Sequence, residues 1–108
     1  FHQSDFSEAG NEDIARGTED YESPRERHVQ RILKHIDVER IRARRFRVAL
    51  DGVNGAGSTM SVWFLQDILG CELHAIHVDP SKAFPREAEP TPETLGELTG
   101  LVQRERCD

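Results

Sequence analysis

The residues of this chain that could take part in chemistry gather in one short run, Asp51-Gly52-Val53-Asn54-Gly55-Ala56-Gly57. A carboxylate and an amide lie between glycines, which let the backbone turn through angles closed to other residues and approach a neighbour closely. Loops of this kind between a strand and a helix bind phosphate groups in many nucleotide-binding proteins. This glycine loop is therefore the first candidate for a functional site.

Two interpretations of the loop are open from the residues alone. A dinucleotide-binding module would use Gly55 and Gly57, with Asp79 in the place of the acid that binds ribose, but Met60 stands where the third glycine belongs. A purely structural turn would only let a helix pack on its strand. A Walker A loop is excluded, because no Lys-Ser or Lys-Thr follows the glycines.

The loop is expected between a strand and a buried helix. Residues 46–51 alternate in the period of a strand, with Phe46, Val48 and Leu50 on one face. The helix that follows is apolar almost all round and should end at Gly70, a residue suited to helix C-termini. Its apolar positions are Met60, Val62, Trp63, Phe64, Leu65, Ile68 and Leu69. Strand, loop and helix form the opening half of a βαβ unit.

Downstream of this unit, residues 72–78 have apolar side chains on both faces, as a parallel strand covered on both sides would have. Residues 79–92 form a proline-rich loop without a period. Thr91 and Pro92 predict the cap and first position of a last helix, which runs out near residue 105.

Upstream, Ser23, Pro24 and Glu26 predict a helix start with a capping box. The apolar stripe of this helix is Val29, Ile32, Leu33 and Ile36. A second short helical piece is expected from Asp37 to about Arg44.

The predicted fold is an incomplete three-layer α/β domain, with at least two parallel strands and covering helices. A linker-like acidic arm (residues 1–22) and a helix precede these strands, and the domain as a whole takes residues 23–108. Two strands make too small a sheet to bury three apolar helix faces, so we expect the polypeptide to continue into a third strand. The chain also lacks an initiator Met, which is typical of a fragment or a processed chain.

Charge is distributed unevenly along the 108 residues. The net charge is −6; residues 1–22 hold seven acids and one arginine, whereas residues 23–108 hold 13 acids and 13 bases. A neutral folded part argues against a nucleic-acid or membrane surface. No apolar run approaches the roughly 18 residues of a membrane helix. With two isolated cysteines and no CxxC, the sequence predicts a reduced, cytoplasmic protein.

Three segments in order resemble the α-D-phosphohexomutases, the family of phosphoglucomutase, phosphomannomutase and phosphoglucosamine mutase. The glycine loop after its Val-Ala-Leu strand is similar to the opening of the second domain of that family. Residues 28–45 resemble the helix and connector that lead into this domain, and Phe84-Pro85 with residues 89–93 resembles its FP…PNPE-type loop. The resemblance covers residues 24–108, as the first part of domain II.

The resemblance implies an enzyme that moves a phosphoryl group between the C1 and C6 oxygens of a hexose phosphate. It implies a phosphoserine, a bisphosphate intermediate and Mg²⁺, whose ligands would lie outside this chain, as would the catalytic serine and the remaining mutase domains. No residue here is then catalytic or metal-binding. The loop residues Asp51, Asn54, Gly55 and Gly57 would support the active site, and the 108-residue piece alone would be inactive.

Overall fold

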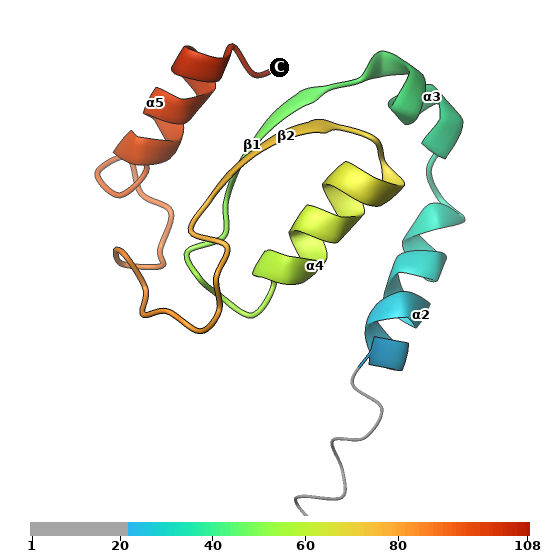
Figure 1. Ribbon diagram of the computed structural model, residues 1–108, viewed down its shortest axis with the longest axis horizontal. Helices are drawn as coiled ribbons and strands as arrows, with labels where there is room; N and C mark the ends of the chain where they lie inside the picture. Colours follow the sequence, from blue (N-terminus) through green and yellow to red (C-terminus); the bar gives the residue numbers. More distant parts are fainter. Residues whose placement is uncertain (1–21) are drawn as a thin grey trace, which may run out of the picture. The chain divides into compact units, whose positions relative to one another are not determined.

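The computed structural model describes residues 22–108, with side chains from Pro24 onward (Figure 1). The chain divides between Lys34 and His35 into two compact units, which are described separately. Most of the predicted acidic arm, residues 1–21, lies outside the described residues. The domain boundary after residue 22 therefore stays a prediction.

The described part of the first unit is the helix α2, Glu22–Leu33. It begins one residue before the predicted cap, so Ser23 lies within the helix rather than ahead of it. Three residues of the predicted apolar stripe lie on this helix, with Val29 buried and Ile32 and Leu33 half-buried, whereas the fourth, Ile36, lies beyond its end. His28, next to Val29 in the chain, is exposed.

The second unit holds the glycine loop and the strands. It opens with α3, Val38–Arg44, the short helical piece that the sequence predicted. Asp37 caps its first turn, because Asp37 Oδ1 accepts a hydrogen bond from the Arg40 backbone N–H at 3.0 Å. The other elements follow in chain order as β1 (Arg47–Asp51), α4 (Ser58–Val62), the π-helix η2 (Trp63–Ile68), β2 (Glu72–Ile76) and α5 (Gly96–Glu105).

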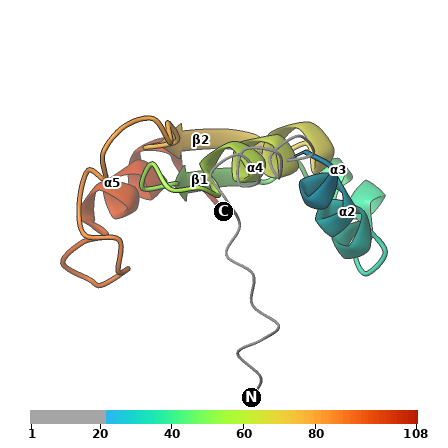
Figure 2. The ribbon, with the colours of Figure 1, turned by 90° about the horizontal axis from the view of Figure 1, so that it is seen from below.

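The two strands are parallel, and their register pairs Arg47 with Glu72 and Asp51 with Ile76 (Figure 2). Figure 1 shows them between α5 on one side and α4 on the other. α5 lies against both strands, and η2 contacts β2. The prediction of an incomplete three-layer α/β unit with parallel strands is confirmed. Parallel pairing places the C-terminal ends of both strands at one edge of the sheet.

The second unit buries few apolar residues for a sheet that is covered by helices. Leu69, Cys71 and Leu101 are its buried apolar residues, while all five residues of β1 are only half-buried. Both cysteines are free, and burial raises the pKa of the Cys71 thiol. Half-buried strand residues indicate a sheet that leaves part of its surface uncovered.

The predicted helix over residues 60–69 forms, but not as one α-helix. After Val62 the coil widens to a π-helix, in which the Leu69 N–H reaches the Phe64 carbonyl at 2.9 Å. Gly70 then closes the helix with a φ of 65°, as the sequence predicted. None of the helices between residues 22 and 108 is long and apolar enough to cross a lipid bilayer.

The predicted start of the last helix at Thr91 and Pro92 is wrong. Here the Thr91 N–H donates to Thr94 Oγ1 at 2.9 Å, and the Thr94 hydroxyl donates to the Glu89 carbonyl at 2.7 Å. These threonine contacts close a separate turn, a known alternative to a helix cap. α5 therefore begins at Gly96, with Leu95 before it and no side-chain cap.

β2 is also shorter than predicted. It ends at Ile76 instead of Val78, because His77 has a φ of 52° and leaves the extended conformation. The turn at His77 directs the chain into the loop of residues 79–92, next to the end of β1.

Candidate functional site

The glycine loop begins with a tight turn directly after β1. The Gly55 N–H donates to the Gly52 carbonyl at 2.8 Å, and the two central residues, Val53 and Asn54, have φ values of 52° and 54°. Positive φ at both central positions is the conformation of a type I′ turn. Asn tolerates this conformation, whereas a β-branched residue does so only with strain, so Val53 is the strained position.

Gly52 is the glycine that packing requires. A Cβ there would lie 2.6 Å from Ser58 Oγ and 2.8 Å from the His77 carbonyl oxygen. The space is closed because Ser58, only 1% exposed, donates its hydroxyl to the Gly52 carbonyl at 3.2 Å. The end of β1, the start of α4 and the end of β2 therefore meet at Gly52.

Asn54 joins the glycine loop to the loop that follows β2. Its side-chain Nδ2 donates to the Ala83 carbonyl at 2.9 Å, and its Oδ1 accepts from the Asp79 N–H at 3.0 Å. The Asn54 backbone N–H donates to the His77 carbonyl at 2.6 Å. Both ends of this 7% exposed amide are thus committed to holding the two loops together.

Asp51 ends β1 with a buried carboxylate, whose side chain is 1% exposed. Asp51 Oδ2 accepts hydrogen bonds from Arg86 Nη2 at 2.7 Å and Nε at 3.1 Å, and Oδ1 accepts from the Val53 N–H at 3.0 Å. Two guanidinium nitrogens on one carboxylate form a charge-assisted pair. This pair fastens the 79–92 loop to the end of β1.

Asp79, the candidate ribose acid of the dinucleotide interpretation, is occupied within its own loop. Its Oδ1 accepts from the Ser81 hydroxyl at 2.6 Å and the Ser81 N–H at 3.1 Å, and Lys82 Nζ lies 3.5 Å from its Oδ2. The hydrogen bonds from Ser81, with the charge of Lys82, lower the pKa of Asp79.

The polar side chains of the glycine loop are suited to holding the two loops in place rather than to catalysing a reaction. Its carboxylate, amide and serine hydroxyl all have partners inside the chain, so none is left to act as base or nucleophile. Across residues 22–108, no three His, Cys, Asp or Glu side chains come together in a group that could hold a metal ion. These residues therefore do not fit Mg²⁺, and no step is assigned to the metal here.

Of the four residues expected to support a site, the structure brings Asp51 and Asn54 together with the 79–92 loop. The Gly55 N–H donates to the Gly52 carbonyl and the Gly55 carbonyl accepts from the Ser58 N–H, while the nearest atom to a Cβ at Gly57 is 4.0 Å away. Sequence reasoning missed Arg86 and the special position of Gly52. Arg86 is a single arginine in an irregular loop, so no sequence pattern could predict that it pairs with Asp51, 35 residues earlier in the chain.

The two histidines near β2 serve a different contact. His77 Nε2 lies 2.9 Å from Glu97 Oε2 and His74 Nδ1 lies 3.5 Å from Glu105 Oε2, so they hold the two ends of α5 to β2. His74 also contacts Glu72, and this hydrogen bond, with the charge of Arg47, lowers the pKa of Glu72.

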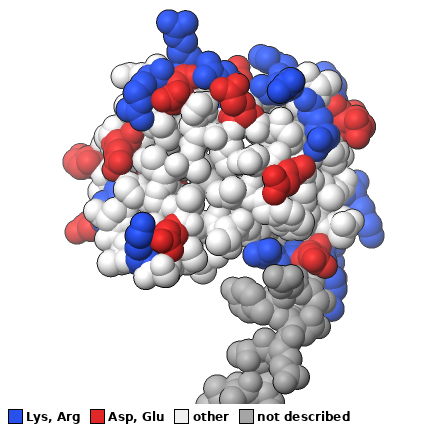
Figure 3. All heavy atoms as spheres, viewed as in Figure 1, with Lys and Arg blue, Asp and Glu red and all other residues white. Residues whose placement is uncertain are grey.

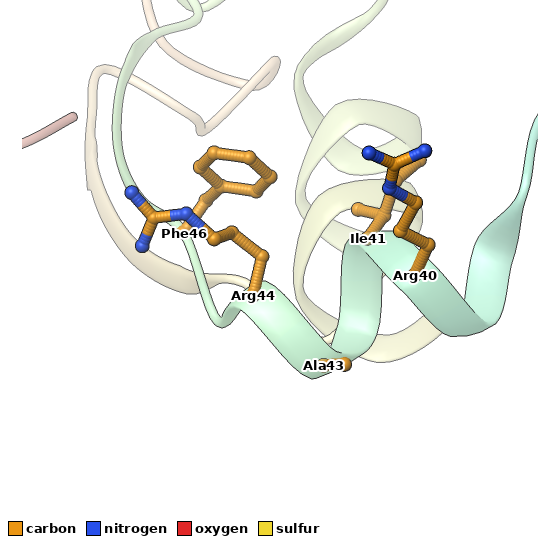
Figure 4. Close-up of a pocket in the computed structure, with 5 residues that line it drawn as sticks. All are labelled: Arg40, Ile41, Ala43, Arg44 and Phe46. Carbon is orange, nitrogen blue, oxygen red and sulfur yellow. The ribbon is translucent and has the colours of Figure 1, made fainter.

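An open hollow of about 540 Å³ lies beside α3, lined by Arg40, Ile41, Ala43, Arg44 and Phe46 (Figure 4). The Arg44 guanidinium stands over the Phe46 ring, 5.1 Å from its centroid. This hollow lies at the N-terminal end of β1, whereas ligands of parallel α/β sheets bind beyond the C-terminal ends of the strands. The glycine loop, at the correct end, remains the candidate site.

Several arginines between Arg40 and Arg47 have partners within the second unit. Arg42 donates to the carbonyls of Asp67 and Ile68 at the end of η2, Arg44 pairs with Asp108, and Arg47 pairs with Glu72. On the face seen in Figure 3, basic side chains alternate with acidic ones and form no continuous basic patch.

The fold and the site together define a parallel α/β unit whose glycine loop is clamped to the loop after the next strand. Comparison with known proteins names the family. Residues 26–108 match the family model described as phosphoglucomutase/phosphomannomutase, alpha/beta/alpha domain II. The chain belongs to this family, as its resemblance predicted.

Curated relatives carry the names of this family. A phosphoglucomutase/phosphomannomutase of Thermococcus kodakarensis is 34% identical over 95% of this chain and 21% of its own length. A phosphoglucosamine/phosphogalactosamine mutase of Sulfurisphaera tokodaii is 30% identical over 75% of this chain and 18% of its own. A probable phosphoglucosamine mutase of Pyrococcus horikoshii is 33% identical over 81% and 18%.

The chain thus spans about a fifth of the length of the curated relatives that it matches. No solved structure matches it significantly. The matches name mutases, and do not favour the nucleotide-binding alternative.

Proposed function

We propose that this chain is the first part of domain II in a larger phosphohexomutase, which interconverts hexose 1-phosphate and hexose 6-phosphate. The reaction would pass through a phosphoserine and a bisphosphorylated sugar, with the serine, the sugar-binding loop and the phosphate-binding residues in the other domains. Mg²⁺, when bound, would neutralise charge on the transferring phosphoryl group, with ligands outside residues 22–108. The observation that carries the proposal is the domain II match over residues 26–108.

Within that enzyme, the glycine loop would be a rigid support beside the reacting groups. Phosphoryl transfer depends mainly on positioning and on fixed positive charge, so a loop that holds its neighbours still contributes without touching the substrate. The structure supports this role through Asp51 and Asn54, which are tied to the loop of residues 79–92 at both ends. Ser58 is not proposed as a nucleophile, because its hydroxyl is buried and donates to the Gly52 carbonyl.

The proposal is tested with the 108-residue chain and the longer polypeptide of which it would be part. Each is assayed for mutase turnover with glucose 1-phosphate, mannose 1-phosphate and glucosamine 1-phosphate. The longer polypeptide should convert at least one of the three, and the 108-residue chain none. Turnover by the 108-residue chain, or none by the longer polypeptide, would contradict the proposal.

The supporting role is tested by two variants of the longer polypeptide on the same loop. Arg86→Ala should lower kcat by about tenfold or more, because it removes the clamp, the pair of Arg86 and Asp51 that fastens the 79–92 loop to the end of β1. Lys82→Ala is the matched control, since Lys82 is largely exposed and its contact with Asp79 is long. Equal activities of both variants, measured well below their unfolding temperatures, would show that the clamp does not serve catalysis.

A further inference from the structure

Arg40 and Arg44 lie one turn apart on α3, and their side chains extend to the same side of this helix (Figure 4). Like charges at this spacing repel each other, so the pair does not stabilise the helix. Within residues 22–108, the Arg40 guanidinium makes no hydrogen bond or ion pair. The Arg44 guanidinium has one acidic partner there, Asp108, in an exposed contact of 3.6 Å. Most N–H donors of the two guanidinium groups are therefore free to bind a ligand.

The hollow that these arginines line also has an apolar part, formed by Ile41, Ala43 and Phe46. Its volume of about 540 Å³ lies within the range of small-molecule sites. Arg44 is stacked over the Phe46 ring, 5.1 Å from its centroid, and this contact orients the guanidinium plane while its edge stays available for hydrogen bonds. No acid of the described part of the chain lines the hollow. The hollow therefore offers two positive charges beside an apolar surface.

We propose that this hollow is a further binding site, and that its ligand is a small phosphate monoester with an apolar body. The phosphate accepts hydrogen bonds from Arg40 and Arg44, whose planar guanidinium groups match the spacing of phosphate oxygens. A monoester carries a charge of about −1.5 to −2 near neutral pH, which balances two arginines better than a single carboxylate does. The apolar body lies on Ile41 and Phe46, because inorganic phosphate alone would leave most of the hollow to water.

The neighbouring arginines limit the ligand to a small molecule. Arg42 donates to the carbonyls of Asp67 and Ile68, and Arg47 pairs with Glu72, so neither extends the site along the surface. A nucleic acid would need a row of basic side chains to follow its phosphates. Two free arginines beside one hollow fit a single phosphate group.

This site is separate from the glycine loop. The hollow lies at the N-terminal end of β1, whereas the glycine loop follows the C-terminal end. The five residues of β1, at about 3.3 Å each, set the two ends roughly 15 Å apart. A ligand in the hollow therefore leaves the glycine loop free, and the proposal does not depend on the mutase assignment.

Two-dimensional NMR of the 108-residue chain tests the proposal, with phenyl phosphate as the probe and with inorganic phosphate and phenol as comparators. Phenyl phosphate should shift the amide signals of residues 40–46 in a saturable manner. Its Kd should be lower than that of either comparator by about tenfold or more, because only phenyl phosphate uses both the charged and the apolar part of the hollow. The amides of Asn54 and Gly55 report on the glycine loop and should not shift.

Variants of the two arginines test which side chains bind the probe. Arg40→Gln and Arg44→Gln should each raise the Kd of phenyl phosphate about tenfold, since each removes one guanidinium group. Arg40→Gln is the cleaner variant, because Arg44 also contacts Phe46 and Asp108. Arg45→Gln is the matched control, because Arg45 is exposed and does not line the hollow. It makes the same change of charge and should alter the Kd less than about twofold.

Several results would overturn the proposal. One is the absence of saturable shifts in residues 40–46 with phenyl phosphate. Another is equal affinity for inorganic phosphate and phenyl phosphate, which would leave the apolar part of the hollow without a role. A third is an Arg45→Gln variant that weakens binding as much as Arg40→Gln, since the attraction would then come from general charge. None of these measurements uses mutase turnover, so failure of the proposed function is recognised separately.

Discussion

The C-terminal end of β1 differs from the edge of β1 that faces away from β2 in how completely the rest of the second unit covers it. At the C-terminal end, the Asp51 carboxylate, the Asn54 amide and the Ser58 hydroxyl each bond to a partner within the second unit. Along that edge, an open groove of about 400 Å³ is lined by Phe46, Val48, Ala49 and Val102 among others. The contrast indicates that the glycine-loop end of β1 is held in place by contacts within the second unit, whereas the edge that faces away from β2 is held less completely.

The largest effect on stability, and the strongest test of this comparison, is expected from the buried ion pair of Asp51 and Arg86. Arg86→Ala leaves the Asp51 carboxylate buried without a cation and should lower the free energy of unfolding by about 3 kcal/mol. Urea denaturation of the 108-residue chain measures it. Arg44→Ala, on the open side, breaks an exposed pair with Asp108 and should cost less than about 1 kcal/mol. Equal losses in the two variants would remove the contrast.

A somewhat smaller loss is expected when the packing at Gly52 is disturbed. Gly52→Ala places a methyl group against Ser58 Oγ and the His77 carbonyl, and should destabilise by about 2 kcal/mol. Gly57→Ala is the control, because its methyl group would have space and φ there is −79°. Thermal unfolding followed by circular dichroism compares them. A Gly52→Ala melting temperature equal to that of Gly57→Ala would contradict the packing described here.

A substitution in the turn of the glycine loop should stabilise the chain. Val53→Asn replaces a β-branched residue at positive φ with one that tolerates this conformation, and should stabilise the chain by about 1 kcal/mol. The same change in the longer polypeptide shows whether the strain serves the enzyme. Unchanged kcat with higher stability would make the strain incidental, whereas lower kcat would link the turn to positioning. A destabilised variant would contradict the expected relief of strain.

The smallest effect is expected from acid. The pKa values of Asp79, Glu72 and Glu93 are lowered, mainly by hydrogen bonds from Ser81 to Asp79, from His74 to Glu72 and from the backbone to Glu93. Their stabilisation is therefore complete above the ordinary carboxyl pKa of about 4 and is lost as pH falls through the lowered values. Urea midpoints should hold steady between about pH 7 and pH 5 and fall below about pH 4.

Ser81→Ala tests the cause of this slope, because it removes the hydroxyl that lowers the pKa of Asp79 most. The variant should be less stable than the unaltered chain at neutral pH and should lose less stability on acidification, because the pKa of its Asp79 lies closer to the value in the unfolded chain. An unchanged pH profile would assign the loss to other carboxylates.

The local elements were predictable because their patterns are local. Alternation gave β1, apolar residues on both faces gave a parallel β2, and Gly70 marked the end of the helix between them. The start of α5 was not, since Thr91 is equally suited to a cap and to the threonine turn that it makes with Thr94. The change from α-helix to π-helix at Trp63–Ile68 was also not predictable, because the apolar content of a helix does not distinguish the two forms.

The candidate site was predicted by position and only partly by contact. Glycines after a strand point to a turn, but which glycine is sterically required depends on Ser58 and His77, which arrive from other elements. The pairing of Asp51 with Arg86 joins a strand end to an irregular loop, where no period fixes the orientation of a side chain. Contacts of this kind follow from tertiary packing.

The Asn54-Gly55 pair in the turn also affects the chemical stability of the protein. In an Asn-Gly pair, the glycine nitrogen can attack the asparagine side chain and expel ammonia, which makes such sites vulnerable to heat and age. Folding restrains this reaction here, because the Gly55 N–H is held by Gly52 and the Asn54 amide is held at both ends. Each unfolding event releases that restraint. An aspartate formed at position 54 would set a carboxylate oxygen against the Ala83 carbonyl, so a damaged chain would not regain its clamp.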